Sequence, residues 1–107
     1  MAVFWIERFE VRPDARATAE RAMHELAAYV RSQLPDVAWT AYRDPGAPGQ
    51  YVALGRADNR AADERRRTAP GTQAFVAALA PLVVRPIDAT EYELVTSSDL
   101  APRRRTR

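Results

Sequence analysis

Hydrophobic residues change their spacing several times along this chain, and these changes predict its secondary structure. Apolar and polar residues alternate at residues 2–11, Val37–Arg43 and Gln50–Ala57, and again in a last run that starts at Arg85-Pro86. Such alternation is typical of strands. Two stretches between these runs have apolar residues three or four positions apart, as amphipathic helices do. The resulting order, β-α-β-β-α-β, predicts an α+β, ferredoxin-like fold with a four-stranded antiparallel sheet.

The two helical stretches differ in continuity. The first is expected to run from an N-cap at Asp14 to about Gln33. Its predicted buried stripe consists of four apolar residues: Ala19, Met23, Leu26 and Val30. The second is expected in two pieces, with Asp58 as the cap of a short polar helix that ends near Arg66. Residues 68–72 interrupt it, and the following piece has its own apolar stripe: Phe75, Leu79 and Leu82.

Both predicted helices should cover the same face of the sheet, because β-α-β crossovers are right-handed. The strands nevertheless carry apolar residues on both faces. In the first strand, Phe4 and Ile6 point one way and Trp5 points the other. We expect an uncovered face that includes Trp39 and Leu54, which is a large apolar patch for a monomer. A second copy of the chain, packed sheet against sheet in a homodimer, is the predicted cover.

RNA binding is an alternative use of such a face. RNA-recognition modules share this order of elements and stack bases on aromatic residues of their sheet. The third strand here offers only Tyr51, where that module has several aromatics. The net charge of +2 also gives no broad basic face. We therefore expect no nucleic-acid partner.

Composition is that of one soluble domain. The chain has 107 residues, of which 47% are hydrophobic and 28% are charged, and no apolar run approaches the roughly 20 residues of a membrane span. Residues 1–96 are predicted to form a single domain, and residues 97–107 a basic, disordered tail. The N-terminus does not look like a secretory signal, so we expect a cytoplasmic protein without membrane association.

Residue types that carry catalytic or metal chemistry are scarce. Without cysteine the chain has no disulfides, thiolate nucleophiles or sulfur ligands. His24 is the only histidine, and no cluster of histidine and carboxylate residues predicts a metal site. Neither Ser32 nor Ser97 lies in a nucleophile-elbow sequence. The tryptophans, Trp5 and Trp39, are expected in the core or at the dimer interface.

Several short segments are similar to the antibiotic biosynthesis monooxygenase family. They lie between about Ala2 and Val95 and comprise Ile6-Glu7-Arg8-Phe9 with Arg12-Pro13, Tyr42-Arg43-Asp44-Pro45, Leu54-Gly55-Arg56-Ala57-Asp58-Asn59, Thr68-Ala69-Pro70, and the stretch from Ala74 to Leu82. The resemblance implies a dimeric α+β barrel with a ligand pocket inside each protomer, between the sheet and the helices. It also implies oxidation of an aromatic, quinol-like or polyketide-like molecule by O₂, with no cofactor.

Compared position by position with this family, the chain lacks several polar groups. Quinone-forming members have an asparagine and a tryptophan where this chain has Ala53 and Ala57, and a tyrosine where it has Asp63. A second-helix histidine of other members corresponds to Arg66. The first-strand asparagine of the haem-degrading branch corresponds to Glu7. A non-catalytic dimeric barrel, which binds a ligand or serves as structure, is therefore an alternative to an oxygenase.

Small residues in the third strand suggest where a ligand could lie. Ala53, Gly55 and Ala57 alternate on one face, beside Tyr51 and, across the hairpin, Tyr42. This row either leaves a ligand cavity or is filled by larger side chains from the helices.

The candidate site residues follow from this row and from the resemblance. Arg66 could direct a guanidinium at an anionic or phenolate ligand, or could be an ordinary solvated helix end. The candidate catalytic residues are Tyr42, Tyr51 and Arg66. The expected pocket residues are Tyr42, Tyr51, Ala53, Gly55, Ala57, Asp63 and Phe75.

Overall fold

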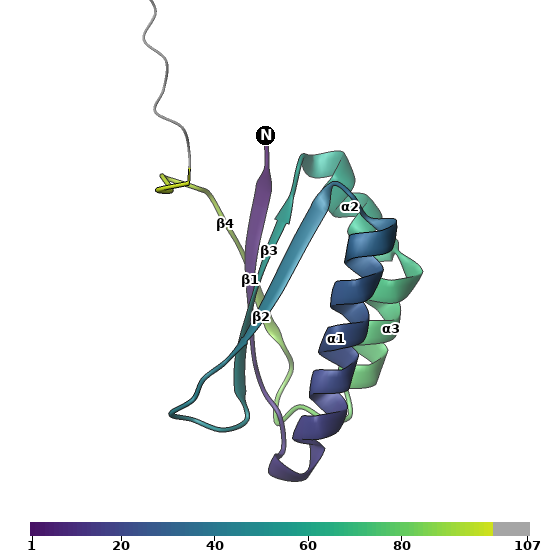
Figure 1. The fold of residues 1–107 in the computed structure, drawn as a ribbon, viewed down its shortest axis with the longest axis vertical. Helices are drawn as coiled ribbons and strands as arrows, with labels where there is room; N and C mark the ends of the chain where they lie inside the picture. Colours follow the sequence, from purple (N-terminus) through teal and green to yellow (C-terminus); the bar gives the residue numbers. More distant parts are fainter. Residues whose placement is uncertain (100–107) are drawn as a thin grey trace, which may run out of the picture.

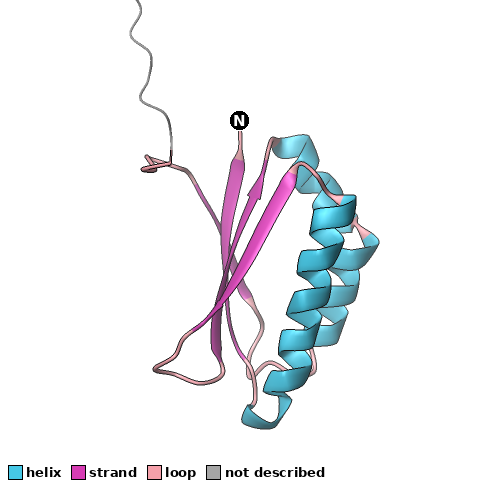
Figure 2. Ribbon diagram, viewed as in Figure 1, coloured by secondary structure: helices cyan, strands magenta, loops and turns pink. Residues whose placement is uncertain are grey.

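Four antiparallel strands form one sheet, and the helices pack on one of its faces (Figures 1 and 2). The computed structural model describes residues 1–99. Its strands are β1 (Val3–Glu10), β2 (Val37–Arg43), β3 (Gln50–Ala57) and β4 (Asp88–Tyr92). Their order in the sheet is β2-β3-β1-β4. This order, with two β-α-β crossovers, is that of the ferredoxin-like fold, so the predicted fold class is confirmed.

The register of the strands decides which side chains point towards the helices. Trp5 of β1 lies opposite Gly55 of β3, and Gly55 also lies opposite Trp39 of β2. These residues, and every second residue from them, point to the helix-covered side of the sheet, which we call the inner face. Alternation along β1 places Glu7 on the inner face as well.

The predicted face for Trp39 is wrong, because Trp39 and Leu54 point in opposite directions. Leu54 precedes Gly55 in β3 and therefore points away from the helices, as predicted. Trp39 points inward, where its ring meets that of Phe75 edge to face with 5.4 Å between centroids. A register difference of one residue moves a side chain to the other face of a sheet.

The side of the sheet away from the helices, which we call the outer face, has an apolar centre. Phe4 and Ile6 of β1 lie there beside Val52 and Leu54 of β3. Leu54 keeps 42% of its surface exposed, and the other three are half-buried. Both long helices, α1 and α3, lie on the inner face in Figure 2.

α1 (Arg16–Gln33) follows a 3-10 turn at Pro13–Ala15. The predicted stripe is buried against the sheet and α3: Ala19, Met23, Leu26 and Val30. Asp14 was predicted as the N-cap, and this is wrong. Asp14 lies inside the 3-10 turn, with its carboxylate 3.7 Å from Arg12, and Ala15 occupies the cap position without a side-chain hydrogen bond.

A single residue, Ala69, separates α2 (Arg60–Thr68) from α3 (Pro70–Leu79). Its backbone is extended, at φ −64° and ψ 141°, which is the conformation favoured before a proline. Pro70 then opens α3, since the first turn of a helix needs no N–H from it. The predicted break is confirmed, but it is shorter than residues 68–72.

The cap of α2 also differs from the prediction. Asn59, not Asp58, is the N-cap: its Oδ1 accepts a hydrogen bond from the Ala62 N–H at 2.8 Å. Asp58 instead pairs with Arg56 of β3 at 2.6 Å. Two residues, Asp58 and Asn59, separate the end of β3 from α2, which extends across one end of the sheet (Figure 1).

β4 is a short, exposed edge strand that starts at Asp88, three residues later than predicted. Within residues 1–99 no helix is both long and apolar enough to cross a membrane. The predicted basic tail, residues 97–107, lies mostly outside the described residues, which end at Asp99.

Candidate functional site

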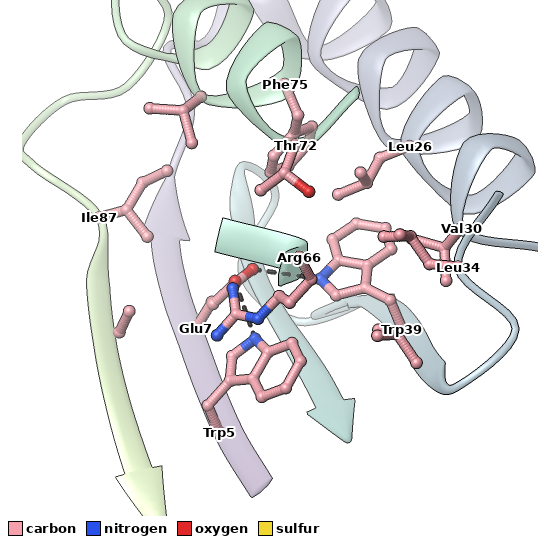
Figure 3. A pocket seen from close by; sticks show the side chains of 13 residues that line it. Trp5, Glu7, Leu26, Val30, Leu34, Trp39, Arg66, Thr72, Phe75 and Ile87 are labelled. Carbon is pink, nitrogen blue, oxygen red and sulfur yellow. Dashed lines mark hydrogen bonds between the residues drawn. The ribbon is translucent and has the colours of Figure 1, made fainter. Parts of the chain in front are cut away.

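A cavity of about 230 Å³ lies between the inner face and the helices (Figure 3). Three helices, three strands and the segment before β4 line it with thirteen residues: Trp5, Glu7, Leu26, Val30, Leu34, Val37, Trp39, Arg66, Thr72, Phe75, Val76, Ile87 and Ala89. Val76 and Ala89 are exposed, so the cavity reaches the surface. Ten of these residues are aliphatic or aromatic, and such a lining favours an apolar ligand.

One end of this cavity is polar, and Glu7 lies at its centre (Figure 3). Trp5 Nε1 donates a hydrogen bond to Glu7 Oε2 at 3.0 Å, and Trp39 Nε1 donates one to Glu7 Oε1 at 3.2 Å. Trp39 reaches Glu7 across β3, where the facing residues are the small Ala53 and Gly55. Both carboxylate oxygens are thus held by indoles, and both indoles have the partner that a buried N–H needs.

Arg66 of α2 extends over the same end. Its guanidinium carbon is 3.5 Å from the centroid of the Trp5 ring, a cation–π contact. Its Nε and Nη2 donate to Asp63 Oδ1 at 3.0 Å and 2.9 Å. Burial lowers the pKa of Arg66, while the charges of Asp63 and Glu7 act in the opposite direction. The group stays cationic, because guanidinium is not deprotonated in proteins.

Asp63 holds this arginine in place. Its side chain is fully buried and also pairs with Arg67 at 3.0 Å and Arg60 at 3.5 Å. It does not line the 230 Å³ cavity. It borders a neighbouring hollow of about 270 Å³, which shares Trp5, Glu7, Arg66 and Ala89 with that cavity.

The predicted row of small residues in β3 does not itself line the cavity. Ala53, Gly55 and Ala57 are buried, and none is among the lining residues. The space above Gly55 is taken by Trp5, since a Cβ there would be 1.9 Å from Cε2 of the indole. A strand side chain, rather than a ligand or a helix side chain, thus lies over the middle of the row.

The two candidate tyrosines lie apart from Arg66 and Phe75. The register pairs Tyr42 with Val52 and Arg43 with Tyr51, so Tyr42 and Tyr51 point to opposite faces. Both border a second hollow of about 240 Å³, beside α1. Of the candidate residues, the structure therefore places Arg66 and Phe75 at the apolar cavity and the two tyrosines at another site.

Tyr51 is bound to a carboxylate of α1. Its hydroxyl donates to Glu20 Oε2 at 2.6 Å, and Arg43 donates to both Glu20 oxygens at 2.9 Å and 3.0 Å. Burial, with this hydrogen bond, raises the pKa of Tyr51 to about 12. The Arg43 and Tyr51 hydrogen bonds lower the pKa of Glu20. These contacts join α1 to the hairpin of β2 and β3.

Glu7 and the two indoles were not among the candidate site residues. One signal in the sequence could have found Glu7, because it is a charged residue between Trp5 and Phe9 on the otherwise apolar side of the first strand. A carboxylate on a buried face needs partners. The partner from β2, Trp39, depends on a register that the sequence alone did not provide.

No group of three or more histidine, aspartate or glutamate side chains within residues 1–99 is arranged to hold a metal ion. His24 is exposed on α1 and borders the hollow beside Tyr51.

Solved structures share this fold closely. The structure of Rv0793 from Mycobacterium tuberculosis superposes with a TM-score of 0.83 at 23% identity, over 92% of this chain and 99% of that one. SnoaB from Streptomyces nogalater, described as a cofactor-independent oxygenase and solved as a point mutant, has a TM-score of 0.79 at 22% identity, over 92% and 98%. A structure named antibiotic biosynthesis monooxygenase has a TM-score of 0.80 at 20% identity, over 90% and 100%.

No protein-family model matches the chain, and no curated protein matches it. Many of the structures with matching folds are named as antibiotic biosynthesis monooxygenases. The chain therefore has the fold of the antibiotic biosynthesis monooxygenases, the family that its sequence resembles.

Proposed function

We propose that this protein is a member of the antibiotic biosynthesis monooxygenase family that binds a small, quinol-like aromatic molecule and oxidises it with O₂ without a metal or other cofactor. One observation carries the proposal: an apolar cavity that ends at Glu7 and Arg66, between the sheet and the helices. The fold shared with SnoaB, which is described as a cofactor-independent oxygenase, supports it.

The size of the cavity limits the ligand. About 230 Å³ is below the roughly 300–1,000 Å³ of sites for drug-sized molecules. One or two fused aromatic rings are therefore favoured over a four-ring polyketide. The Trp39 and Phe75 rings, which meet edge to face, offer flat apolar surfaces against which such a ligand would pack.

The proposed reaction replaces a ring CH₂ by a carbonyl. The CH₂ carbon and O₂ give C=O and H₂O: one oxygen atom is bonded to the carbon, and the other leaves as water with the two hydrogens of the carbon. Electrons come from the substrate, so no other reductant is required. The protein would hold the ring away from water, and the Arg66 cation would stabilise the negative charge that develops on the substrate oxygen during the reaction.

The test is O₂ consumption with a panel of 1-naphthols, whose keto tautomers carry a ring CH₂, measured against spontaneous oxidation without protein. We expect protein-dependent uptake with at least one of them, and quinone and water as products. Arg66→Gln should lower the rate about tenfold or more, the equivalent of about 1.4 kcal/mol. Arg65→Gln is the matched control, because Arg65 is exposed and pairs with Asp36 away from the cavity.

A ligand-binding protein without oxygenase activity is the second candidate. It is favoured by Ala53, Ala57 and Asp63, which stand where quinone-forming members have an amide, an indole and a phenol. Binding of these aromatics without O₂ uptake would support this candidate and contradict the oxygenase. Failure to bind any of them would contradict both.

We also propose that the protein is a homodimer in which two outer faces meet. Phe4, Ile6, Val52 and Leu54 form an apolar centre that neither long helix covers. Burying such a surface against its own copy gives a closed, two-fold interface. The cavity lies on the inner face, so each protomer would retain its own ligand site.

A further inference from the structure

Among residues 1–99, Glu7 is the only acidic side chain that lines the apolar cavity. Arg66 and Thr72 are the other polar residues in this lining, and its remaining polar side-chain atoms are the two indole nitrogens of Trp5 and Trp39. What this polar end can offer a ligand depends on which of its donors and acceptors are already engaged.

The indole donors are engaged with Glu7 itself. Trp5 Nε1 and Trp39 Nε1 each donate their single hydrogen to one carboxylate oxygen, at 3.0 Å and 3.2 Å. A carboxylate has about four acceptor positions, so about two remain on Glu7. The polar end therefore offers a ligand an acceptor in a fixed orientation.

The charges at this end disfavour an anionic ligand. Arg66 has 15% of its side chain exposed and already pairs with the fully buried Asp63, and its charge also acts on Glu7. A ligand carboxylate would enter beside the Glu7 carboxylate with no hydrogen to donate to it. Repulsion between two carboxylates is strong where water is scarce.

We propose that Glu7, oriented by the Trp5 and Trp39 indoles, selects uncharged aromatic ligands that carry an O–H group. The ligand hydroxyl donates a hydrogen bond to Glu7, and its ring lies in the apolar part of the cavity. This inference rests on the proposed function only in that the cavity must bind an aromatic molecule. It does not depend on oxidation.

Three ligands of nearly the same size test this selection: a naphthol, its methyl ether, and the corresponding naphthoate. Their affinities are measured by titration calorimetry at neutral pH. We expect the naphthol to bind at least tenfold more tightly than the ether, because the ether leaves the Glu7 acceptor without a donor. The naphthoate should bind more weakly than either.

Glu7→Gln tests the residue. The glutamine oxygen accepts one indole N–H, but its amide nitrogen is a donor and opposes the other. The preference for naphthol over ether should fall to about threefold or less, and the naphthoate should gain affinity relative to the ether. Glu25→Gln is the matched control, since Glu25 is exposed on α1 and should keep the wild-type preferences.

The wild-type series decides the inference even if Glu7→Gln fails to fold, which circular dichroism would show. Equal binding of naphthol and ether, or tighter binding of the naphthoate, would overturn it. Naphthol selectivity without any O₂ uptake would support the inference while contradicting the oxygenase. Binding of none of the three would contradict both.

Discussion

The indole of Trp5 lies directly over Gly55 on the neighbouring strand. A Cβ on Gly55 would be 1.9 Å from Cε2 of that ring and 2.5 Å from its Nε1. The absence of a side chain at Gly55 therefore sets the position of the indole, and with it the hydrogen bond from Trp5 to Glu7. A single glycine in β3 thus determines the geometry at the polar end of the cavity.

Gly55→Ala should destabilise the protein and disturb the cavity together. The added methyl must displace the Trp5 ring, and overpacking of this kind costs about 1–3 kcal/mol. We expect the free energy of unfolding in urea to fall by about 2 kcal/mol. Affinity for naphthol should fall as well, because the displaced indole no longer orients Glu7.

Gly46→Ala is the control for this variant. Gly46 lies in the turn between β2 and β3, and the nearest atom to its added Cβ would be Asp44 Oδ1 at 3.5 Å, an ordinary contact. The free energy of unfolding of the Gly46→Ala variant should match that of the wild type within about 0.5 kcal/mol. A Gly55→Ala protein that is as stable as the Gly46→Ala protein would show that Trp5 does not need this space.

Asp63→Asn should strongly destabilise the protein, although the two side chains have nearly the same size. The amide fills the same space but removes the negative charge that holds Arg66, Arg67 and Arg60. Removing one partner of a buried ion pair costs about 3–5 kcal/mol. The lower end of this range applies here, because two of the three arginines, Arg60 and Arg67, are more than half exposed and remain solvated. We expect a loss of about 3 kcal/mol in urea unfolding.

Glu64→Gln, one residue further along α2, is the matched control for Asp63→Asn. Glu64 is exposed, so the free energy of unfolding of this variant should differ from that of the wild type by less than about 0.5 kcal/mol. Equal losses in the two variants would mean that the Asp63 cluster contributes no more than an ordinary surface charge.

Local patterns were enough to predict the elements of this fold. The bounds of β2 and β3 agree with the alternating runs, and the end of α1 at Gln33 agrees with the proline-containing break that follows. Periodicity and Pro or Gly positions are properties of neighbouring residues. Caps were less predictable: Asp14 and Asp58 are both good capping types, and in each case the helix begins later.

The cavity could not be predicted in the same way. Its polar end joins Trp5, Glu7, Trp39 and Arg66, which come from three separate elements. The inward direction of Trp39 depends on its pairing with Gly55, and a shift of one residue would reverse it. The row of small residues correctly indicated a region without bulky β3 side chains, but not that Trp5 would occupy part of it.

Tyr51 should make the folded protein less stable at alkaline pH. Its pKa is raised from 10.0 to about 12 in the folded state. Between these values the unfolded chain loses the phenol proton while the folded protein retains it, so stability falls as the pH rises. The contribution of the protonated Tyr51 phenol to the free energy of unfolding is fully present below pH 10 and is lost towards pH 12. This change amounts to about 2–3 kcal/mol.

The measurement is urea unfolding at several pH values for the wild type and Tyr51→Phe. Below pH 10 the variant should be less stable, because it lacks the hydrogen bond to Glu20. The difference between the two proteins should shrink from pH 10 to pH 12. Tyr92→Phe, at an exposed position of β4, should retain the wild-type pH dependence. A constant difference between wild type and Tyr51→Phe would contradict the raised pKa.

Leu54→Asp should separate the proposed dimer into folded monomers. Leu54 is 42% exposed in the protomer, so an aspartate there can reach water in the monomer, whereas two apposed outer faces would bury it next to Ile6. Sedimentation velocity should show a dimer for the wild type and a monomer for Leu54→Asp, with unchanged circular dichroism. Val84→Asp makes the same kind of change at a half-exposed position outside the sheet, and it should remain dimeric. A wild-type protein that stays monomeric at high concentration would rule out the outer face as a self-association surface.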